Sequence, residues 1–465
     1  MRLVPFLLAF TLASVGCGEE SRVKLPDPQQ LYFPTGVVHS SAGGDAGVLY
    51  VASSDFDKRF DFGMITALPL DSLGLGVPTY LQPDGGGGLP VVDGGTEITT
   101  LGVDAGQFVH IAPFAGQMAA WMKEDGGVRL FTPSRAEDDR VFAVDADGAQ
   151  LTCVGDATTR DCTSSAPSLT EPAVRGDEGY HEGKPRAPAP YAVAVDPGGT
   201  VYLTHLELAT SPVASEDNRE AFLVKLKADA NPFSVSPEDF RSIGTVASSG
   251  IAIGARYVYL SGRSLGTVAP ALRLIDTLDP ARPALAVHLE SEFRVTDMRD
   301  VVLSADETRL FLVTHAHRLV VASGSDQLLI IEIAGKDADF PILTVVGAVA
   351  LPAGPTQATL IPRKPGRRSL VAISCTDANS VALYDDAAGQ LANVIAAGIG
   401  AQPFGIAVHA PPSAPGARLF VSNFGDGQIS VIDIPDVHAP SDARVVARLG
   451  PSHRCVTDEN APGCE

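Results

Sequence analysis

The sequence predicts an all-β fold, a seven-bladed β-propeller built from four-stranded antiparallel blades. Three observations predict it: a motif that recurs along the chain, strand-like hydrophobic periodicity inside every copy, and a composition rich in turn-forming residues. Gly (46) and Pro (35) are abundant among the 465 residues, whereas aromatic residues make up only 6%. Such a composition is typical of many short strands joined by many turns.

The recurring motif is clearest in residues 402–434, QPFGIAVHAPPSAPGARLFVSNFGDGQISVIDI. It has a Pro-aromatic-Gly start, an alternating apolar segment, a Leu-Phe-Val strand, a polar loop and an apolar strand that ends at Asp433. One central strand residue can be assigned to each copy, namely Tyr50, Phe131, Tyr202, Tyr259, Phe311, Leu370 and Phe420. Repeats of roughly 50–60 residues with about four short strands are typical of propeller blades, so seven copies predict seven blades.

Within each copy the apolar residues alternate or form short runs bounded by Gly, Pro, Asp or Asn, which is strand periodicity. Residues 285–303 occupy the place of a first strand and are therefore predicted as strand. The predicted propeller covers 31–450, with turn-rich insertions near 83–97 and 164–190 that a blade can loop out. The chain offers a first strand at its start and a last strand at 444–449, so packing alone is one way to close the ring, and the mode of closure stays open.

The N-terminus has the pattern of an export signal. Residues 1–16 hold one positive charge and an apolar core that is too short to span a membrane. Cys17 and a polar linker over 17–30 follow, an arrangement that resembles a bacterial lipoprotein signal in which Cys17 carries the lipid. An ordinary secretory signal cleaved nearby is the alternative. The expected location is the cell envelope, as an outer-membrane lipoprotein facing the periplasm or the surface, with the lipid as its only membrane contact.

The remaining cysteines also agree with export. Cys153 and Cys162 frame one Asp- and Gly-containing segment, and Cys455 and Cys464 frame another in the C-terminal tail of 451–465. Neither segment contains a His or a further Cys that would favour a metal site. Local disulfides are therefore predicted in both, as expected for an oxidising compartment.

The strand motif resembles that of the YVTN-type, YncE-like seven-bladed β-propeller family. That family carries a Tyr-Val-Thr-Asn-like tetrapeptide followed by a strand that ends in Asp. The nearest matches are 420–423 (FVSN) with 431–433 (VID), and 50–53 (YVAS). The resemblance covers roughly 30–450 and implies the propeller architecture. It also implies a surface or periplasmic binding or scaffold role, although relatives include lactonase-like enzymes and cofactor-bearing dehydrogenase subunits, and one fold hosts many functions.

Polar residues in the predicted loops between second and third strands are the candidates for ligand binding, because these loops share one face of a propeller. Arg263, Asp377, Asn379, Asn423 and Asp426 occupy such positions and are predicted to face a shared pocket or groove. The alternative is that the Asp and Asn side chains close turns by hydrogen bonds to the backbone.

Two groups of residues are candidate metal ligands. Asp55, Asp57 and Asp61 lie within one loop and offer oxygen ligands for Ca²⁺, although Lys and Arg in the same loop favour a self-paired, solvated segment. His315 and His317, two apart on a strand, face the same side and form a workable pair for a transition metal. Two exposed histidines at a strand end are the simpler interpretation.

No sequence pattern points to a particular reaction. The chain lacks a Gly-x-Ser-x-Gly elbow, a haem-attachment motif, a Walker A motif and a Rossmann unit. The net charge is 34 − 55 = −21 and no basic run is present, which excludes nucleic acid as an expected partner. The prediction is a monomeric, non-enzymatic, envelope-anchored propeller that needs no cofactor and binds a protein, peptide or polysaccharide. The alternative is a lactonase-like hydrolase or lyase with a metal or carboxylate site at the axial pocket. Electron transfer through a bound cofactor is least favoured.

Overall fold

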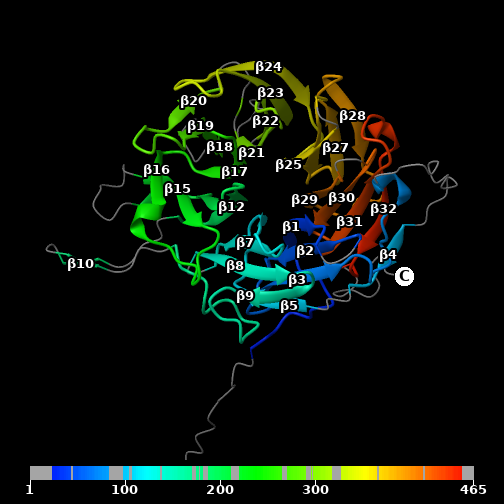
Figure 1. Cartoon of the computed structure of the whole chain (residues 1–465), viewed down its shortest axis with the longest axis horizontal. Helices are drawn as coiled ribbons and strands as arrows, with labels where there is room; N and C mark the ends of the chain where they lie inside the picture. Colours follow the sequence, from blue (N-terminus) through cyan, green and yellow to red (C-terminus); the bar gives the residue numbers. More distant parts are fainter. Residues whose placement is uncertain are drawn as a thin grey trace, which may run out of the picture.

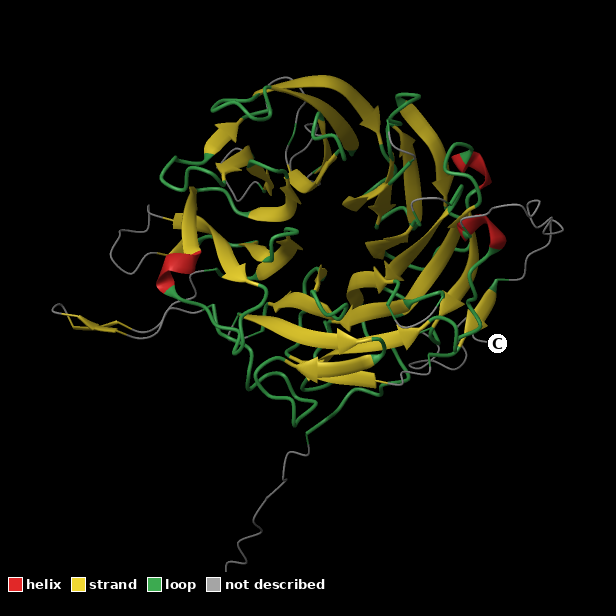
Figure 2. Cartoon of the chain, in the orientation of Figure 1, coloured by secondary structure: helices red, strands yellow, loops and turns green. Residues whose placement is uncertain are grey.

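In the computed structural model, seven antiparallel sheets surround a central axis like the blades of a propeller (Figure 1). The structure describes residues 23–452 except 43–44, 83–97, 104–106, 137–138, 170–173, 177–178, 182–186, 211–218, 264–269, 290–294, 296, 317–325, 364–365 and 412–413. Strands dominate this part, and its three helices are short 3₁₀ turns (Figure 2). The predicted all-β, seven-bladed propeller of four-stranded antiparallel blades is confirmed.

The strands of the first four blades follow one another from the axis outward. They are β1 (Pro34–Ser40), β2 (Val48–Ser53), β3 (Gly63–Pro69) and β5 (Gln107–Ile111) in blade one; β6 (Ala119–Met122), β7 (Val128–Ser134), β8 (Arg140–Asp147) and β9 (Gln150–Cys153) in blade two; β12 (Pro190–Val195), β13 (Thr200–His205), β15 (Arg219–Lys227) and β16 (Phe240–Gly244) in blade three; and β17 (Ser248–Ile253), β18 (Tyr257–Gly262), β19 (Leu272–Asp276) and β20 (Leu285–Val287) in blade four.

The last three blades repeat this order, and a few short elements lie outside it. The blade strands are β21 (Asp297–Leu303), β22 (Arg309–His315), β23 (Gln327–Ala334) and β24 (Ile342–Ala350) in blade five; β25 (Pro355–Ile361), β26 (Leu370–Cys375), β27 (Ser380–Asp385) and β28 (Gln390–Ile395) in blade six; and β29 (Pro403–His409), β30 (Ala417–Asn423), β31 (Gln428–Ile434) and β32 (Arg444–Leu449) in blade seven. The additional elements are β4 (Thr99–Leu101), β14 (Ala209–Thr210), the hairpin of β10 (Val174–Gly176) and β11 (Gly179–His181), and the 3₁₀ turns η1 (Thr79–Leu81), η2 (Pro237–Asp239) and η3 (Pro440–Asp442).

The seven residues assigned from the repeat each lie in the second strand of a different blade. All are buried, with at most 3% of their surface exposed: Tyr50, Phe131, Tyr202, Tyr259, Phe311, Leu370 and Phe420. The predicted strand at 285–303 proves to be two strands in different blades, β20 at the outer edge of blade four and β21 on the axis of blade five. The pattern was apolar at both ends because both strands pack on the same interface between blades.

The core lies between neighbouring blades. Second strands such as β2 and β26 are buried along their whole length, because both faces of a blade are covered by other blades. Tyr50 belongs to the cluster between blades one and two, whereas Leu49 packs with Phe420 in the cluster between blades one and seven. Alternate residues of one strand thus serve two interfaces.

The ring is closed by strand pairing, a question that the sequence left open. Strand β4, from the connection between β3 and β5 of blade one, pairs in parallel with β32, the outer strand of blade seven (Figure 1). Leu101 lies opposite Leu449, and the carbonyl of Leu101 accepts a hydrogen bond from the amide of Gly450 at 2.9 Å. The same connection adds Leu73 and Leu75 to the cluster that contains Phe420.

Polar contacts also join every blade to the next near the edge where second strands begin. In each contact a hydroxyl or guanidinium of one blade donates to a carbonyl or carboxylate of its neighbour. The pairs, in order around the ring, are Tyr50–Gly148, Arg129–Ala228, Arg241–Asp276, Arg256–Asp339, Arg309–Asp386, Arg363–Val437 and Arg418–Gly76.

Candidate functional site

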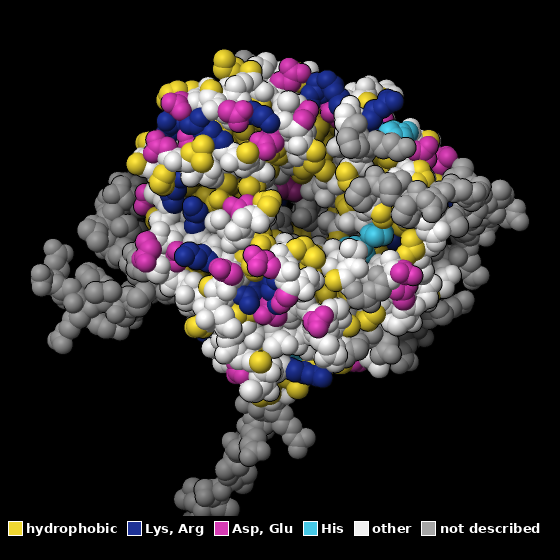
Figure 3. All heavy atoms as spheres, viewed as in Figure 1, with side chains coloured by type: hydrophobic (Ala, Val, Ile, Leu, Met, Phe, Trp, Pro, Cys, Tyr) yellow, Lys and Arg dark blue, Asp and Glu magenta, His cyan; other side chains and the backbone are white. Residues whose placement is uncertain are grey.

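The two faces of the disc carry different groups. We call the face where first strands begin the upper face; because Pro34 lies opposite Ser53 and Pro190 opposite His205, the turns that follow second strands lie there too. First strands end on the lower face. In the space-filling view the disc is hollowed at its centre, and acidic and basic side chains are spread over the blades around it (Figure 3).

Five side chains from four blades meet near the axis on the upper face, and we call them the axial cluster. Arg135 and Arg263 follow the second strands of blades two and four, whereas Tyr191, Asp297 and Arg299 lie on the innermost strands β12 and β21. Asp297 pairs with both Arg263 (Nε–Oδ1 3.4 Å) and Arg299 (Nε–Oδ2 2.9 Å). The guanidinium carbon of Arg135 lies 5.7 Å from the ring centre of Tyr191.

Positive charge in the axial cluster is incompletely compensated by direct contacts. Among the described residues, the buried Nε of Arg135 has no hydrogen-bond partner. Burial lowers the pKa of both Arg135 and Arg299, and the neighbouring Arg263 lowers each further. Asp139 and Glu207 partly offset this for Arg135 through space. Desolvated guanidinium groups held together in this way gain from an additional anionic partner.

A protonatable carboxyl lies beside the axial cluster. Asp300 is buried on β21, and burial raises its pKa to about 7 although its oxygens accept backbone hydrogen bonds from Val301 (2.9 Å) and Ala358 (2.8 Å). Its charge acts on the buried hydroxyl of Tyr191, whose pKa is raised chiefly by burial. Burial thus favours the protonated form of this carboxyl.

Two of the five predicted ligand-binding residues lie at the axial cluster. Arg263 belongs to it, and Asp377 is near enough to raise the pKa of Arg299. The other three hydrogen-bond to residues of blade seven that are distant in sequence or lie on another strand, which is not the turn closure that the alternative interpretation described. Asn379 and Asp426 accept hydrogen bonds from the backbone amides of residues 402 and 401 in blade seven, and the buried Asn423 donates to a serine hydroxyl of β31.

The carboxylates of the predicted calcium loop bond within the loop and to the segment that precedes blade one. Asp57 forms an ion pair with Arg59 at 2.8 Å, Asp61 accepts a hydrogen bond from the amide of Lys24 at 2.7 Å, and Asp55 accepts one from the amide of Phe60 at 3.0 Å. Burial raises the pKa of Asp55 to about 6. Within the described ranges, no group of three His, Cys, Asp or Glu side chains is arranged to hold a metal ion.

Of the two candidate histidines, only His315 lies among the described residues. Its Nδ1 is 2.8 Å from Asp326 Oδ1, and the same carboxylate accepts hydrogen bonds from the amides of Ala316 and Gly354. His317, Cys17, and the cysteine pair Cys455 and Cys464 lie outside the described residues. The disulfide between Cys153 and Cys162 is confirmed, with a Cα–Cα distance of 5.2 Å.

Sequence reasoning missed Arg135, Tyr191 and Arg299. Arg135 could have been found, because it directly follows the second strand of its blade, the position that singled out Arg263. Tyr191 and Arg299 stand near the beginnings of first strands, where only the three-dimensional arrangement distinguishes them from core residues.

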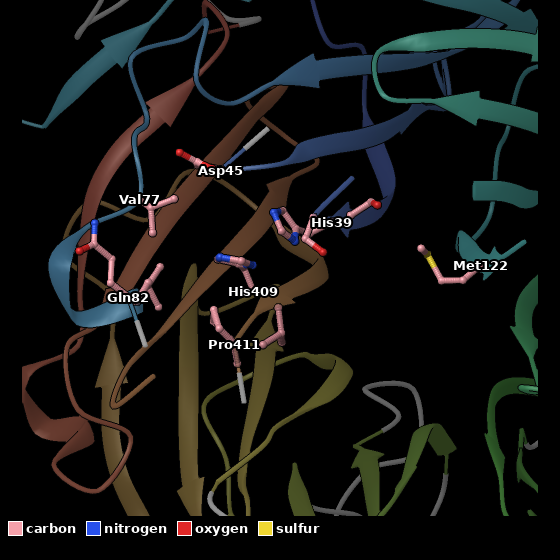
Figure 4. A pocket seen from close by; sticks show the side chains of 12 residues that line it. His39, Asp45, Val77, Gln82, Met122, His409 and Pro411 are labelled. Atoms are coloured by element: carbon pink, nitrogen blue, oxygen red, sulfur yellow. The ribbon is translucent and has the colours of Figure 1, made fainter. Parts of the chain in front are cut away.

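The lower face holds a pocket of about 640 Å³ between blades seven, one and two. Its lining includes His39, His409, Asp45, Gln82 and Met122, and the two imidazoles face each other in Figure 4, with ring centres 4.3 Å apart. Burial lowers the pKa of both histidines, that of His409 to about 4. Both rings are therefore neutral at neutral pH.

Comparison with protein-family models finds no match, and no curated protein matches the sequence. Solved structures share the fold at low identity. They include hydrazine synthase of Kuenenia stuttgartiensis (13% identity, TM-score 0.53, covering 89% of this chain and 98% of that one) and the β-propeller domain of Cps50 (Swd1) from Myceliophteria thermophila (12%, 0.47, 88% and 97%). A third is the periplasmic gluconolactonase PpgL of Pseudomonas aeruginosa (14%, 0.46, 89% and 98%). These likenesses concern the fold alone.

In the part of the chain that is described, no helix has the length and apolar character needed to cross a membrane.

Proposed function

We propose that this protein is a ligand-binding propeller whose axial cluster holds a carboxylate or phosphate group. The observation that carries the proposal is that two guanidinium groups, those of Arg263 and Arg299, share a single contacting carboxylate, Asp297, while the charge of Arg263 also acts on the nearby Arg135. The group bound there belongs to a small molecule or to an acidic side group of the predicted protein, peptide or polysaccharide partner.

The chemistry of the three arginines supports an anionic ligand. Guanidinium groups present several N–H donors in a fixed fork that matches carboxylate and phosphate oxygens. Partial burial strengthens such contacts, because water competes less for the donors. The whole chain has a net charge of −21, so general attraction of anions does not explain binding, and this local arrangement must supply it.

The experiment is a titration of the folded protein with citrate and with inorganic phosphate, followed by thermal unfolding. Because a ligand that binds only the folded state raises Tm, both anions should raise it in a saturable way. Arg135→Gln should abolish most of the increase. Arg444→Gln, on the outer strand of blade seven, is the matched control and should leave it unchanged. An identical increase in all three proteins would mean that the anions act elsewhere.

A second candidate function, hydrolase or lyase chemistry on the bound anion, is favoured by the position of Asp300. A carboxyl that titrates near neutral pH beside the cluster suits proton transfer to or from a bound molecule. Asp300→Asn keeps the size of the side chain but removes the titration. Loss of turnover in this variant with anion binding intact would support an enzyme, whereas turnover that the substitution leaves unchanged would remove this candidate.

The proposed location is the cell envelope, with attachment through a lipid on Cys17. The disulfide between Cys153 and Cys162 supports an oxidising compartment. Membrane fractionation of a Cys17→Ser variant tests the anchor, because the variant should move to the soluble fraction and continued membrane association would contradict it.

A further inference from the structure

Five phenylalanine side chains form a continuous patch on the upper face, and we call it the phenylalanine platform. They come from blades one and seven and from the connection into blade two, and they are Phe33, Phe56, Phe114, Phe404 and Phe424. Neighbouring ring centres are 5.1 Å (Phe33–Phe424), 5.4 Å (Phe56–Phe114 and Phe56–Phe424) and 6.1 Å (Phe404–Phe424) apart. Phe56 is 47% exposed, and the other four are half-buried.

The platform adjoins the axial cluster through Tyr191. The ring of Tyr191 lies edge-on to Phe404 at 6.3 Å, and Arg135 lies against the same ring at 5.7 Å. At the other side of the platform, the ammonium group of Lys58 lies 5.2 Å from the centre of Phe114. An apolar surface is thus bordered by cations on two sides.

The backbone holds two platform residues in a conformation that favours glycine. Phe33 and Phe114 have φ of +49° and +59°, at the turn that leads into a first strand. The same turn also has a positive φ at Ala189 (+54°), Gly354 (+69°) and Gln402 (+55°), so this conformation is a recurring feature of the blades.

The platform and the cluster together specify a ligand with two parts. Phenylalanine rings have no polar atoms, so the surface favours a flat apolar ring over a hydroxylated sugar ring. The neighbouring guanidinium groups favour a carboxylate on that ring. Because Tyr191 contacts both a platform ring and Arg135, a carboxylate carried on or near the aromatic ring suits this arrangement.

We infer that the ligand of this site is an aromatic carboxylic acid, its ring stacked on the phenylalanine platform and its carboxylate bound by Arg135 and the axial cluster. This inference rests on the proposed function, since it names the class of anion that the cluster binds.

The test measures binding of four compounds to the purified propeller by titration calorimetry. The probes are 2-naphthoate, its uncharged analogue 2-naphthamide, gluconate as a carboxylate without a flat ring, and citrate. The site should bind 2-naphthoate about tenfold or more tightly than either 2-naphthamide or gluconate, because only 2-naphthoate uses both regions.

Variants separate the two regions. Phe56→Ser removes an exposed ring, so folding should survive, and it should weaken 2-naphthoate binding about five- to tenfold while citrate binding is unchanged. Phe340→Ser, at a 67% exposed ring in blade five, is the matched control and should change neither. Arg135→Gln should weaken both ligands.

Each outcome decides between the two proposals. If citrate binds but 2-naphthoate binds no better than gluconate, the proposed function stands and the aromatic carboxylate is wrong. If 2-naphthamide binds as well as 2-naphthoate, the platform acts without the cluster and the inference is overturned. If neither citrate nor 2-naphthoate binds, the proposed function itself fails.

Discussion

His205 illustrates how burial fixes the protonation state of one side chain. The imidazole is 1% exposed at the end of β13, and its Nε2 accepts a hydrogen bond from the amide of Phe222 at 2.8 Å. A proton on Nε2 would place two donors against each other. Burial, the largest effect, lowers the pKa of His205 to about 4.

Stability should therefore fall on acidification. The folded protein binds fewer protons at His205 than the unfolded chain, whose histidine titrates near 6.5. The stabilisation is complete above pH 6.5 and is lost as the pH falls toward 4. Between pH 7 and pH 5 this one residue should lower the free energy of unfolding by about 2 kcal/mol.

Urea unfolding at both pH values, compared with His205→Gln, isolates the effect. Asp55 and Asp300 have raised pKa values, so their titration increases the free energy of unfolding on acidification. This contribution is the same in the wild type and in the variant and therefore cancels in the comparison. The variant should be less stable at pH 7 and less sensitive to pH. An unchanged pH dependence would show that His205 titrates normally.

At the scale of strands, the Asp that ends the third strand of the repeat has a structural purpose. In blades two, four, six and seven it binds an arginine of the same blade, and that arginine also reaches the next blade. The pairs are Asp145 with Arg129, Asp276 with Arg256, Asp385 with Arg363 and Asp433 with Arg418. The Asp of the motif that resembles the YVTN pattern thus helps to form a contact between neighbouring blades.

Removing one member of such a pair should be costly. Arg418 binds both oxygens of Asp433, at 2.7 and 3.0 Å, and donates to the carbonyl of Gly76. Arg418→Leu would leave a buried carboxylate unpaired and should lower the free energy of unfolding by about 3–5 kcal/mol. The double variant Arg418→Leu with Asp433→Leu should recover most of that loss, as denaturant unfolding can measure. Equal losses in the single and double variants would contradict this explanation.

Individual strands could be predicted from the sequence, but only part of the site could, namely Arg263 and the neighbouring Asp377. The patterns around Tyr50 and Phe420 are local, and periodicity over six or seven residues reveals them. Arg135, Tyr191 and Arg299 come from three blades, and only the curvature of the ring brings them together. No local sequence pattern indicates that residues of different blades lie close together. Asn379 and Asp426 show the converse, because structural hydrogen bonds to a distant backbone amide and contacts with a ligand use the same residue types.

At the scale of the whole molecule, closure depends on three residues that sequence patterns do not reveal. Strand β4 is too short to show a periodicity, and its parallel partner lies at the far end of the chain. Leu101→Asp would place a charge among Leu449 and its neighbours, and should lower the free energy of unfolding by about 2 kcal/mol or more. Hydrogen exchange in β32 should also become faster.

Thr99→Asp, at an exposed position of the same strand, is the control and should have little effect. Comparable loss of protection in both variants, or in neither, would mean that β4 does not hold the ring closed.

The pairing of β4 with β32 also sets an order of events during synthesis. A ribosome makes β4 early and β32 last. Leu49 and Val51 of blade one, which pack against blade seven in the finished fold, therefore stay exposed while six further blades are made. Non-local contacts of this kind form slowly, and apolar surface that stays exposed invites aggregation. The period before the last blade emerges is therefore the time at which this chain most needs chaperones. A chain interrupted before blade seven would keep the apolar face of blade one exposed and would remain prone to aggregation.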